Sequence, residues 1–193
     1  MKKVKEWQTP QNSTINLSPP SLLALGFLSF IIIGTLLLKL PISHHGELSW
    51  INSLFTASSA VTITGLSVVN VGETFTVTGK IIIMLLIQIG GLGFMTFAIL
   101  AALSLSTKLG LKQQIMAQET IGQTSLSKVS FTIKGVLLYS LFFEAIGTVI
   151  LTIAWLEDYN FNQALFDAAF YSVSAVNNGG FSLFPNILMQ FSG

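Results

Sequence analysis

Residues 81–105 form an apolar stretch without a single charged side chain, and no other feature limits the fold as strongly. A helix of about 20 apolar residues is long enough to cross the hydrocarbon core of a bilayer, inside which the backbone must satisfy its own hydrogen bonds. Residues 22–40 and 136–156 are similarly apolar, and the latter contain Glu144 as their only charged residue. The sequence therefore predicts an all-α membrane protein with a spanning helix in each stretch.

The composition agrees with a membrane protein and excludes several other classes. Charged residues make up only 9% of the chain, whereas soluble domains carry about 25%. Without cysteine, the chain forms no disulfide and offers no thiolate for zinc or catalysis. The nine cationic residues are scattered lysines, which argues against a nucleic-acid partner. The partner that the composition favours is the lipid bilayer.

The distribution of lysine predicts the orientation. Residues 22–40 follow a basic N-terminus, as in a signal peptide, but they are too long for one and lack a small-residue cleavage site, so we expect a retained helix. Lysine is enriched in cytoplasmic segments. We therefore expect a multi-pass plasma-membrane protein with a cytosolic N-terminus and a cytosolic connector between the second and third stretches. The lysines of these two segments are Lys2, Lys3, Lys5, Lys108, Lys112, Lys128 and Lys134.

An internal repeat organises the chain. Moving the sequence by 115 positions aligns residues 59–67 with residues 174–182, with identity at five of nine positions. In the first copy, residues 49–59 suffice for about three helical turns, which is half the thickness of a membrane. Non-helical backbone at that depth is tolerated where it is buried in protein or lines a watery cavity. The sequence therefore predicts two re-entrant pore loops that enter from the outer side.

The repeat also predicts how the chain is divided. A cytosolic segment, residues 1–21, precedes a first helix–pore-loop–helix repeat in residues 22–106. A cytosolic connector follows in residues 107–130, with weakly amphipathic spacing, either as a solvated link or as a docking surface. Residues 131–193 form a second repeat that stops before its last helix, so we expect a truncated chain.

The two loops have the composition of a cation filter. Backbone carbonyls can replace the water of a monovalent cation without introducing fixed charge, and glycine allows the backbone angles that turn them toward one axis. The preceding half-helices would point their partially negative C-terminal ends toward the same place. The candidate ion-binding residues are Val61, Thr62, Ile63, Thr64, Gly65, Val176, Asn177, Asn178, Gly179 and Gly180.

Three segments, TASSAVTITGLSVV, IIIMLLIQIGGLGFMTF and AVNNGGFSLFPN, resemble the membrane subunit of the Ktr potassium-uptake systems in the Trk/Ktr/HKT superfamily. The resemblance implies four helix–pore-loop–helix repeats around one pore, of which this chain would contain about one and three quarters. It implies transport of potassium, with or without linkage to sodium, and places residues 62–65 and 177–180 in the filter. It also implies a homodimer, a cytosolic nucleotide-binding regulatory ring, and no cofactor beyond the transported ion.

Other functions stay open at this point. A non-conducting scaffold or regulatory subunit could keep the same repeat. An intramembrane enzyme would need a nucleophile beside a base, and we do not expect one, because His44 and His45 lie outside the apolar stretches and suit loop positions. Glu144 is either a proton-coupling carboxylate or, the reading we favour, a structural one bonded to the second loop's backbone, to Asn177 or to Asn178.

The glycines near Gln88 also allow two interpretations. Gly90, Gly91 and Gly93 could suggest a nucleotide-binding loop, but they lie inside an apolar stretch and no lysine follows them. Close packing of helices is the better explanation. They could also bend the helix or crowd the filter.

Overall fold

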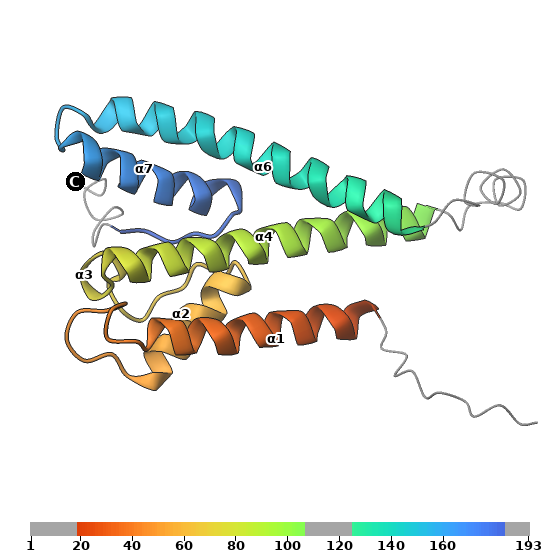
Figure 1. Cartoon of the computed structure of the whole chain (residues 1–193), viewed down its shortest axis with the longest axis horizontal. Helices are drawn as coiled ribbons and strands as arrows, with labels where there is room; N and C mark the ends of the chain where they lie inside the picture. Colours follow the sequence, from red (N-terminus) through yellow and green to blue (C-terminus); the bar gives the residue numbers. More distant parts are fainter. Residues whose placement is uncertain (1–18, 107–124, 184–193) are drawn as a thin grey trace, which may run out of the picture.

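The computed structural model describes residues 19–106 and 125–183 and is built from helices, as predicted. Three long helices lie roughly alongside one another, and two shorter ones lie beside them (Figure 1). In chain order the helices are α1 (Pro19–Leu38), α2 (Trp50–Val61), α3 (Val71–Thr74), α4 (Val77–Ser106), α6 (Ser125–Trp155) and α7 (Phe161–Val176).

Two of the long helices contain stretches long and apolar enough to cross a membrane. These stretches are Val77–Thr96 in α4, with a mean hydropathy of 1.8, and Lys134–Trp155 in α6, with a mean hydropathy of 2.1. In α1 the corresponding stretch, Leu23–Leu38, is shorter. The helices thus occupy the three predicted apolar stretches, although α1 ends at Leu38 and α4 begins at Val77.

The short helices α2 and α7 end about halfway along their long neighbours, after which the chain turns back (Figure 1). Helix α2 begins where the Ser49 side chain accepts a hydrogen bond from the backbone N–H of Asn52, which satisfies one free donor of the first turn. It packs against α1 and α4, while α7 packs against α6 and α4. Helix α4 therefore lies between the two half-length helices.

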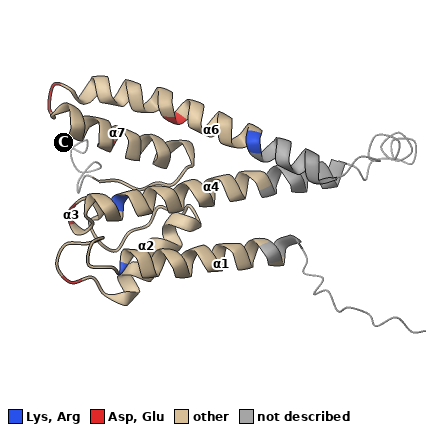
Figure 2. Cartoon of the chain, in the orientation of Figure 1, with Lys and Arg blue, Asp and Glu red and all other residues tan. Residues whose placement is uncertain are grey.

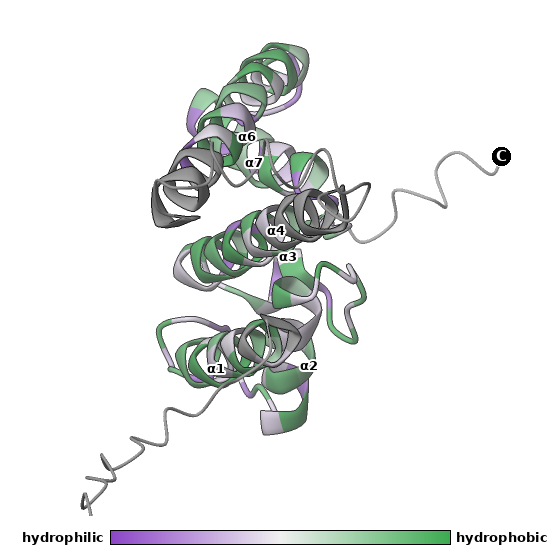
Figure 3. Cartoon of the chain, turned by 90° about the vertical axis from the view of Figure 1, so that its right-hand side faces the viewer, coloured by the Kyte–Doolittle hydropathy of each residue, from purple (hydrophilic) through white to green (hydrophobic). Residues whose placement is uncertain are grey.

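The buried core lies where α4 meets the two short helices and their loops. Its fully buried side chains include Val61, Phe75, Ile83, Ile87 and Phe170. Large apolar side chains are also exposed on the outside of the molecule. In Figure 3 the described parts of the long helices are coloured mostly as hydrophobic residues. An exposed apolar surface of this extent is typical of a protein that contacts lipid or other helices.

Charged residues gather at the end of the molecule where α2 and α7 begin (Figure 2). The acidic residue near the middle of α6 is Glu144, which is 6% exposed. At the charged end, the His44 ring lies 3.0 Å from the Gly46 carbonyl and 3.3 Å from the Lys39 carbonyl, as suits a loop histidine. The N-terminal lysines and most of the predicted connector lie outside the described residues, so the orientation stays a prediction.

Candidate functional site

The loop after α2 leaves the helix through a tight, defined turn. The backbone N–H groups of Thr62, Ile63 and Thr64 donate to the carbonyls of Ser58, Ala60 and Ser59 at 2.9, 3.3 and 3.0 Å. Ile63 and Gly65 then adopt positive φ angles of 52° and 74°. A positive φ is ordinary for glycine and costly for a β-branched side chain, so the surrounding structure must hold Ile63 in place.

The loop after α7 repeats this turn 115 residues later. Asn177, Asn178 and Gly179 donate to the carbonyls of Val173, Ala175 and Ser174 at 3.1, 3.0 and 2.5 Å. Asn178 and Gly180 have φ angles of 58° and 69°. The residues that cap the ends of the two helices also have nearly the same backbone angles. Thr62 has φ −88° and ψ 3°, and Asn177 has φ −85° and ψ 2°. The sequence repeat is therefore also a repeat of backbone conformation.

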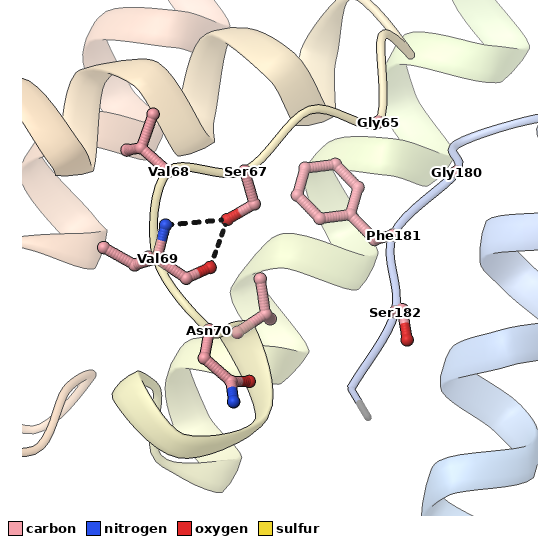
Figure 4. A pocket seen from close by; sticks show the side chains of 9 residues that line it. Gly65, Ser67, Val68, Val69, Asn70, Gly180, Phe181 and Ser182 are labelled. Carbon is pink, nitrogen blue, oxygen red and sulfur yellow. Dashed lines mark hydrogen bonds between the residues drawn. The ribbon is translucent and has the colours of Figure 1, made fainter. Parts of the chain in front are cut away.

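The two loops touch at the aligned glycines. A Cβ atom on Gly65 would lie 2.7 Å from the Gly179 oxygen and 2.8 Å from the Gly180 Cα. A Cβ atom on Gly180 would lie 3.1 Å from the Gly65 Cα. Figure 4 shows the two glycines facing each other across the gap between the loops. Only residues without a side chain allow this approach.

A cavity of about 390 Å³ opens beside the paired glycines. The first loop contributes Ser67 and Asn70 to its lining, and the second contributes Phe181 and Ser182. The Phe181 side chain points from its own loop into the space between the two loops (Figure 4). The cavity therefore reaches the place where the two loops approach each other most closely, at Gly65 and Gly180.

Free carbonyl oxygens are the chemically important feature of both turns. Within residues 19–106 and 125–183, the backbone oxygens of residues 62–65 and 177–180 accept no hydrogen bond from the protein. A free carbonyl dipole is a ligand for a dehydrated alkali cation, and rings of such oxygens build ion filters. The arrangement thus offers two sets of cation ligands on adjacent loops.

The two loops differ in how side chains hold them. In the first, the Thr62 hydroxyl donates to the Ser58 carbonyl at 2.8 Å and lies 2.7 Å from the Thr64 hydroxyl. The Ser59 hydroxyl is buried and has no hydrogen-bond partner in the described part of the chain. The first loop is therefore stabilised mainly by its own threonines.

In the second loop, more distant side chains provide the support. The Ser174 hydroxyl accepts from the Phe181 N–H at 2.9 Å and donates to the Phe181 carbonyl at 3.1 Å. The Tyr171 hydroxyl accepts from the Leu183 N–H at 2.9 Å and lies 2.9 Å from the Ser182 hydroxyl. These contacts fasten the returning chain to α7.

Asn177 connects the second loop to two long helices. Its side-chain amide donates to Gln88 of α4 at 2.9 Å, to Glu144 of α6 at 3.0 Å and to the Val173 carbonyl at 3.0 Å. Ser140 also donates to Glu144, at 2.5 Å. Of the partners expected for Glu144 from the sequence, the structure therefore shows Asn177.

Two glycines of α4 let the loops approach that helix. A Cβ atom on Gly90 would overlap the Val61 carbonyl oxygen, and one on Gly91 would overlap the Asn177 side-chain oxygen. Gly93 has more room, with the Phe27 ring 3.5 Å from its Cβ position. Close packing of this helix, expected from the sequence, is thus packing against both turns.

The structure brings the predicted loop residues together but gives them different exposures. Val61, Asn177 and Gly179 are buried, whereas Ile63, Gly65 and Val176 are half-buried. The remaining predicted residues, Thr62, Thr64, Asn178 and Gly180, are exposed. Residues that support the loops were missed in the sequence; they are Ser140, Tyr171 and Ser174, together with Gln88 as a hydrogen-bond partner. Ser174 lies inside the repeat and is identical to the aligned Ser59, but this identity does not indicate what its side chain binds.

The sequence matches the TrkH family, described as cation transport protein, over residues 3–193. It is 48% identical over 179 residues to Ktr system potassium uptake protein B of Bacillus subtilis, which covers 93% of this chain and 40% of that protein. Identity to the protein of the same name from Vibrio alginolyticus is 40% over 172 residues, or 89% of this chain and 38% of that protein.

The chain is also similar to potassium/sodium uptake protein NtpJ of Enterococcus hirae. The two are 35% identical over 175 residues, which cover 90% of this chain and 39% of that protein. The chain therefore spans about 40% of the length of the curated relatives it matches.

Proposed function

Since this chain belongs to the TrkH family of cation transport proteins, we propose that its two loops form two quarters of a potassium-selective filter. The observation that carries the proposal is the set of free carbonyl oxygens at residues 62–65 and 177–180. These oxygens lie on turns of matching backbone conformation that meet at Gly65 and Gly180. Carbonyl dipoles attract a cation while leaving the site without fixed charge, so that the ion can leave again.

The proposal extends to the arrangement in the membrane. Helices α1, α4 and α6 span the bilayer, α2 and α7 enter it from the outer side, and each ends near its centre. In this arrangement the chain divides into a cytosolic segment in residues 1–21, a first repeat in 22–106, a cytosolic connector in 107–130 and a second, truncated repeat in 131–193. The C-terminal ends of the two half-length helices add partial negative charge where the ion loses its water.

Membership of the family supports a proposal for the transported ion and the partners. Two similar proteins are potassium uptake proteins and a third is a potassium/sodium uptake protein by name, which supports potassium as the main substrate with sodium as a possible companion. The proposed assembly is a plasma-membrane homodimer with a cytosolic N-terminus that binds a cytosolic regulatory ring. The ions move passively through the filter, and the chain performs no covalent chemistry.

Uptake of rubidium, as a potassium substitute, tests the proposal. The complete protein and its Gly65→Ser and Gly180→Ser variants are expressed in cells without their own potassium uptake systems, at matched membrane levels. Gly26→Ser and Gly135→Ser serve as controls, because a Cβ atom at either position meets nothing within 4 Å. We expect the loop variants to lose uptake or ion preference while both controls transport normally.

The opposite result identifies the alternative function. If Gly65→Ser and Gly180→Ser transport rubidium like the parent, with the same preference over sodium, the loops are not the filter. A non-conducting scaffold or regulatory subunit is then the better interpretation of the repeat.

A further inference from the structure

Four polar side chains form a closed hydrogen-bonded ring behind the second loop. Asn177 donates to Gln88 and to Glu144, Gln88 donates to Ser140 at 3.2 Å, and Ser140 donates to the same Glu144 oxygen, Oε1. The ring joins α4, α6 and the end of α7, and Glu144, Ser140 and Asn177 are all buried. Buried polar groups of this kind are costly unless each finds its partner.

The directions of these hydrogen bonds define the role of Glu144. Asn177 uses its amide hydrogens on Glu144, Gln88 and the Val173 carbonyl, all of which are oxygen acceptors. Turning the amide over would place its oxygen against these three acceptor oxygens. The acceptors around the amide nitrogen therefore set its orientation, while the side-chain oxygen of Asn177 is buried without a hydrogen-bond partner among the described residues. Oε1 of Glu144 receives two donors, so Glu144 takes part in the ring as an acceptor.

In the part of the chain that the structure describes, no such ring supports the first loop, although its turn has the same backbone conformation. The position aligned with Glu144 is Ser29, which is exposed and whose hydroxyl donates to the Leu25 carbonyl of its own helix at 2.8 Å. The position aligned with Asn177 is Thr62, whose side-chain hydrogen bonds within the described residues go to Ser58 and Thr64 of its own turn. Equal backbone conformations are therefore maintained in one loop by local hydroxyls and in the other by a distant carboxylate.

We propose that Glu144 is a positioning residue for ion selectivity, which holds Asn177 and thereby the second set of carbonyl oxygens through its acceptor oxygen. This inference rests on the proposed filter function. Glu144 does not carry a proton through the membrane in this role, because a neutral amide oxygen would serve the two donors equally well. What matters is an oxygen at that point in α6.

The test compares Glu144→Gln with Glu144→Ala in the complete protein. The measurement is rubidium uptake in competition with sodium, at membrane levels matched to the parent. Glu144→Gln keeps an acceptor for Ser140 and Asn177, so we expect ion preference close to that of the parent. Glu144→Ala removes both of these hydrogen bonds, and we expect preference for rubidium over sodium to fall by about tenfold or more.

Further variants keep the test decisive if Glu144→Ala fails to reach the membrane. Gln88→Met and Ser140→Ala each interrupt the ring and leave the carboxylate in place, and we expect both to reduce ion preference by a smaller factor. Ser29→Ala is the matched control in the first repeat, and we expect it to transport like the parent.

Three results would overturn the inference. If Glu144→Gln loses transport as fully as Glu144→Ala, the charge or the proton of Glu144 is needed. If Glu144→Ala keeps the parent's ion preference, Asn177 does not depend on Glu144. If Glu144→Ala does not reach the membrane, unchanged ion preference in both Gln88→Met and Ser140→Ala would likewise show that Asn177 does not depend on the ring around Glu144. Gly180→Ser, measured in parallel, separates these results from failure of the filter assignment, because only that failure leaves Gly180→Ser normal.

Discussion

Gly65 and Gly180 are 115 residues apart in the chain, yet a Cβ atom on Gly65 would lie 2.8 Å from the Gly180 Cα. Both also have positive φ angles. Two separate requirements, space and backbone conformation, therefore select glycine at these positions. Alanine substitutions at the two positions separate these requirements.

Alanine at Gly65 should destabilise the protein more than alanine at Gly180. The Cβ atom at Gly65 meets the backbone of the other loop at 2.7 and 2.8 Å, whereas that at Gly180 meets it at 3.1 Å. Gly46→Ala is the control, because Gly46 has a φ of 66° but open space around it. It should cost only the conformational term of about 1–2 kcal/mol. Melting temperatures in detergent measure all three, and equal shifts would mean that the close approach contributes nothing.

Ser174→Ala should destabilise the protein far more than Ser59→Ala, although the two serines are aligned in the repeat. Ser174 makes two hydrogen bonds to the backbone of Phe181, and its loss leaves a buried N–H unsatisfied, at about 1–3 kcal/mol. The Ser59 hydroxyl is buried and has no hydrogen-bond partner among the described residues, so removing it should be neutral or stabilising. Thermal unfolding of both variants in detergent checks this, and similar losses would contradict it.

Alanine at Gly90 or Gly91 should be poorly tolerated, and alanine at Gly93 should be tolerated. The new methyl group at Gly90 would overlap the Val61 carbonyl, and at Gly91 it would overlap the Asn177 side chain. The Gly93 position has its nearest neighbour at an ordinary 3.5 Å. The amount of folded protein in the membrane and rubidium uptake measure the effect. Normal uptake by Gly90→Ala and Gly91→Ala would mean that α4 can move away from the loops.

Thr62→Val should weaken ion preference, and Thr62→Ser should preserve it. The Thr62 hydroxyl donates its hydrogen to the Ser58 carbonyl, so the Thr64 hydroxyl is the donor in the Thr62–Thr64 pair. Valine keeps the shape of threonine but removes both contacts, while serine keeps both. Competition between rubidium and sodium during uptake measures the preference. Equal behaviour of the two variants would show that the hydroxyl is not needed to hold the first loop.

Much of the fold could be predicted because the chain is strongly patterned. Long apolar stretches admit little except helices, and the positive φ angles of Gly65 and Gly180 follow from their alignment in the repeat. The bounds of the helices were predicted less accurately. Helix α2 continues to Val61 rather than residue 59, and α7 is 16 residues long against 12 for α2, so the repeat does not extend to the starts of the short helices.

The remainder depends on contacts that no local pattern indicates. Ile63 has a φ of 52°, which a β-branched residue adopts only when its surroundings impose it. Ser59 and Ser174 are identical letters at aligned positions, and only the fold shows that one has a partner. No local pattern reveals the role of Gln88, because its hydrogen bond to Asn177 joins residues 89 positions apart.

The difference in support between the two loops has a consequence for mutational mapping. The two turns share their backbone conformation, so the need for a positive φ angle at Gly65 in one half predicts the same need at Gly180 in the other. Side-chain substitutions do not transfer in this way, because Thr62 depends on its own turn and Asn177 depends on two other helices. The substitution Thr62→Asn would therefore place the asparagine of the second loop among first-loop neighbours that do not offer it matching hydrogen-bond acceptors. The effects of side-chain substitutions in this protein must therefore be measured separately for each half.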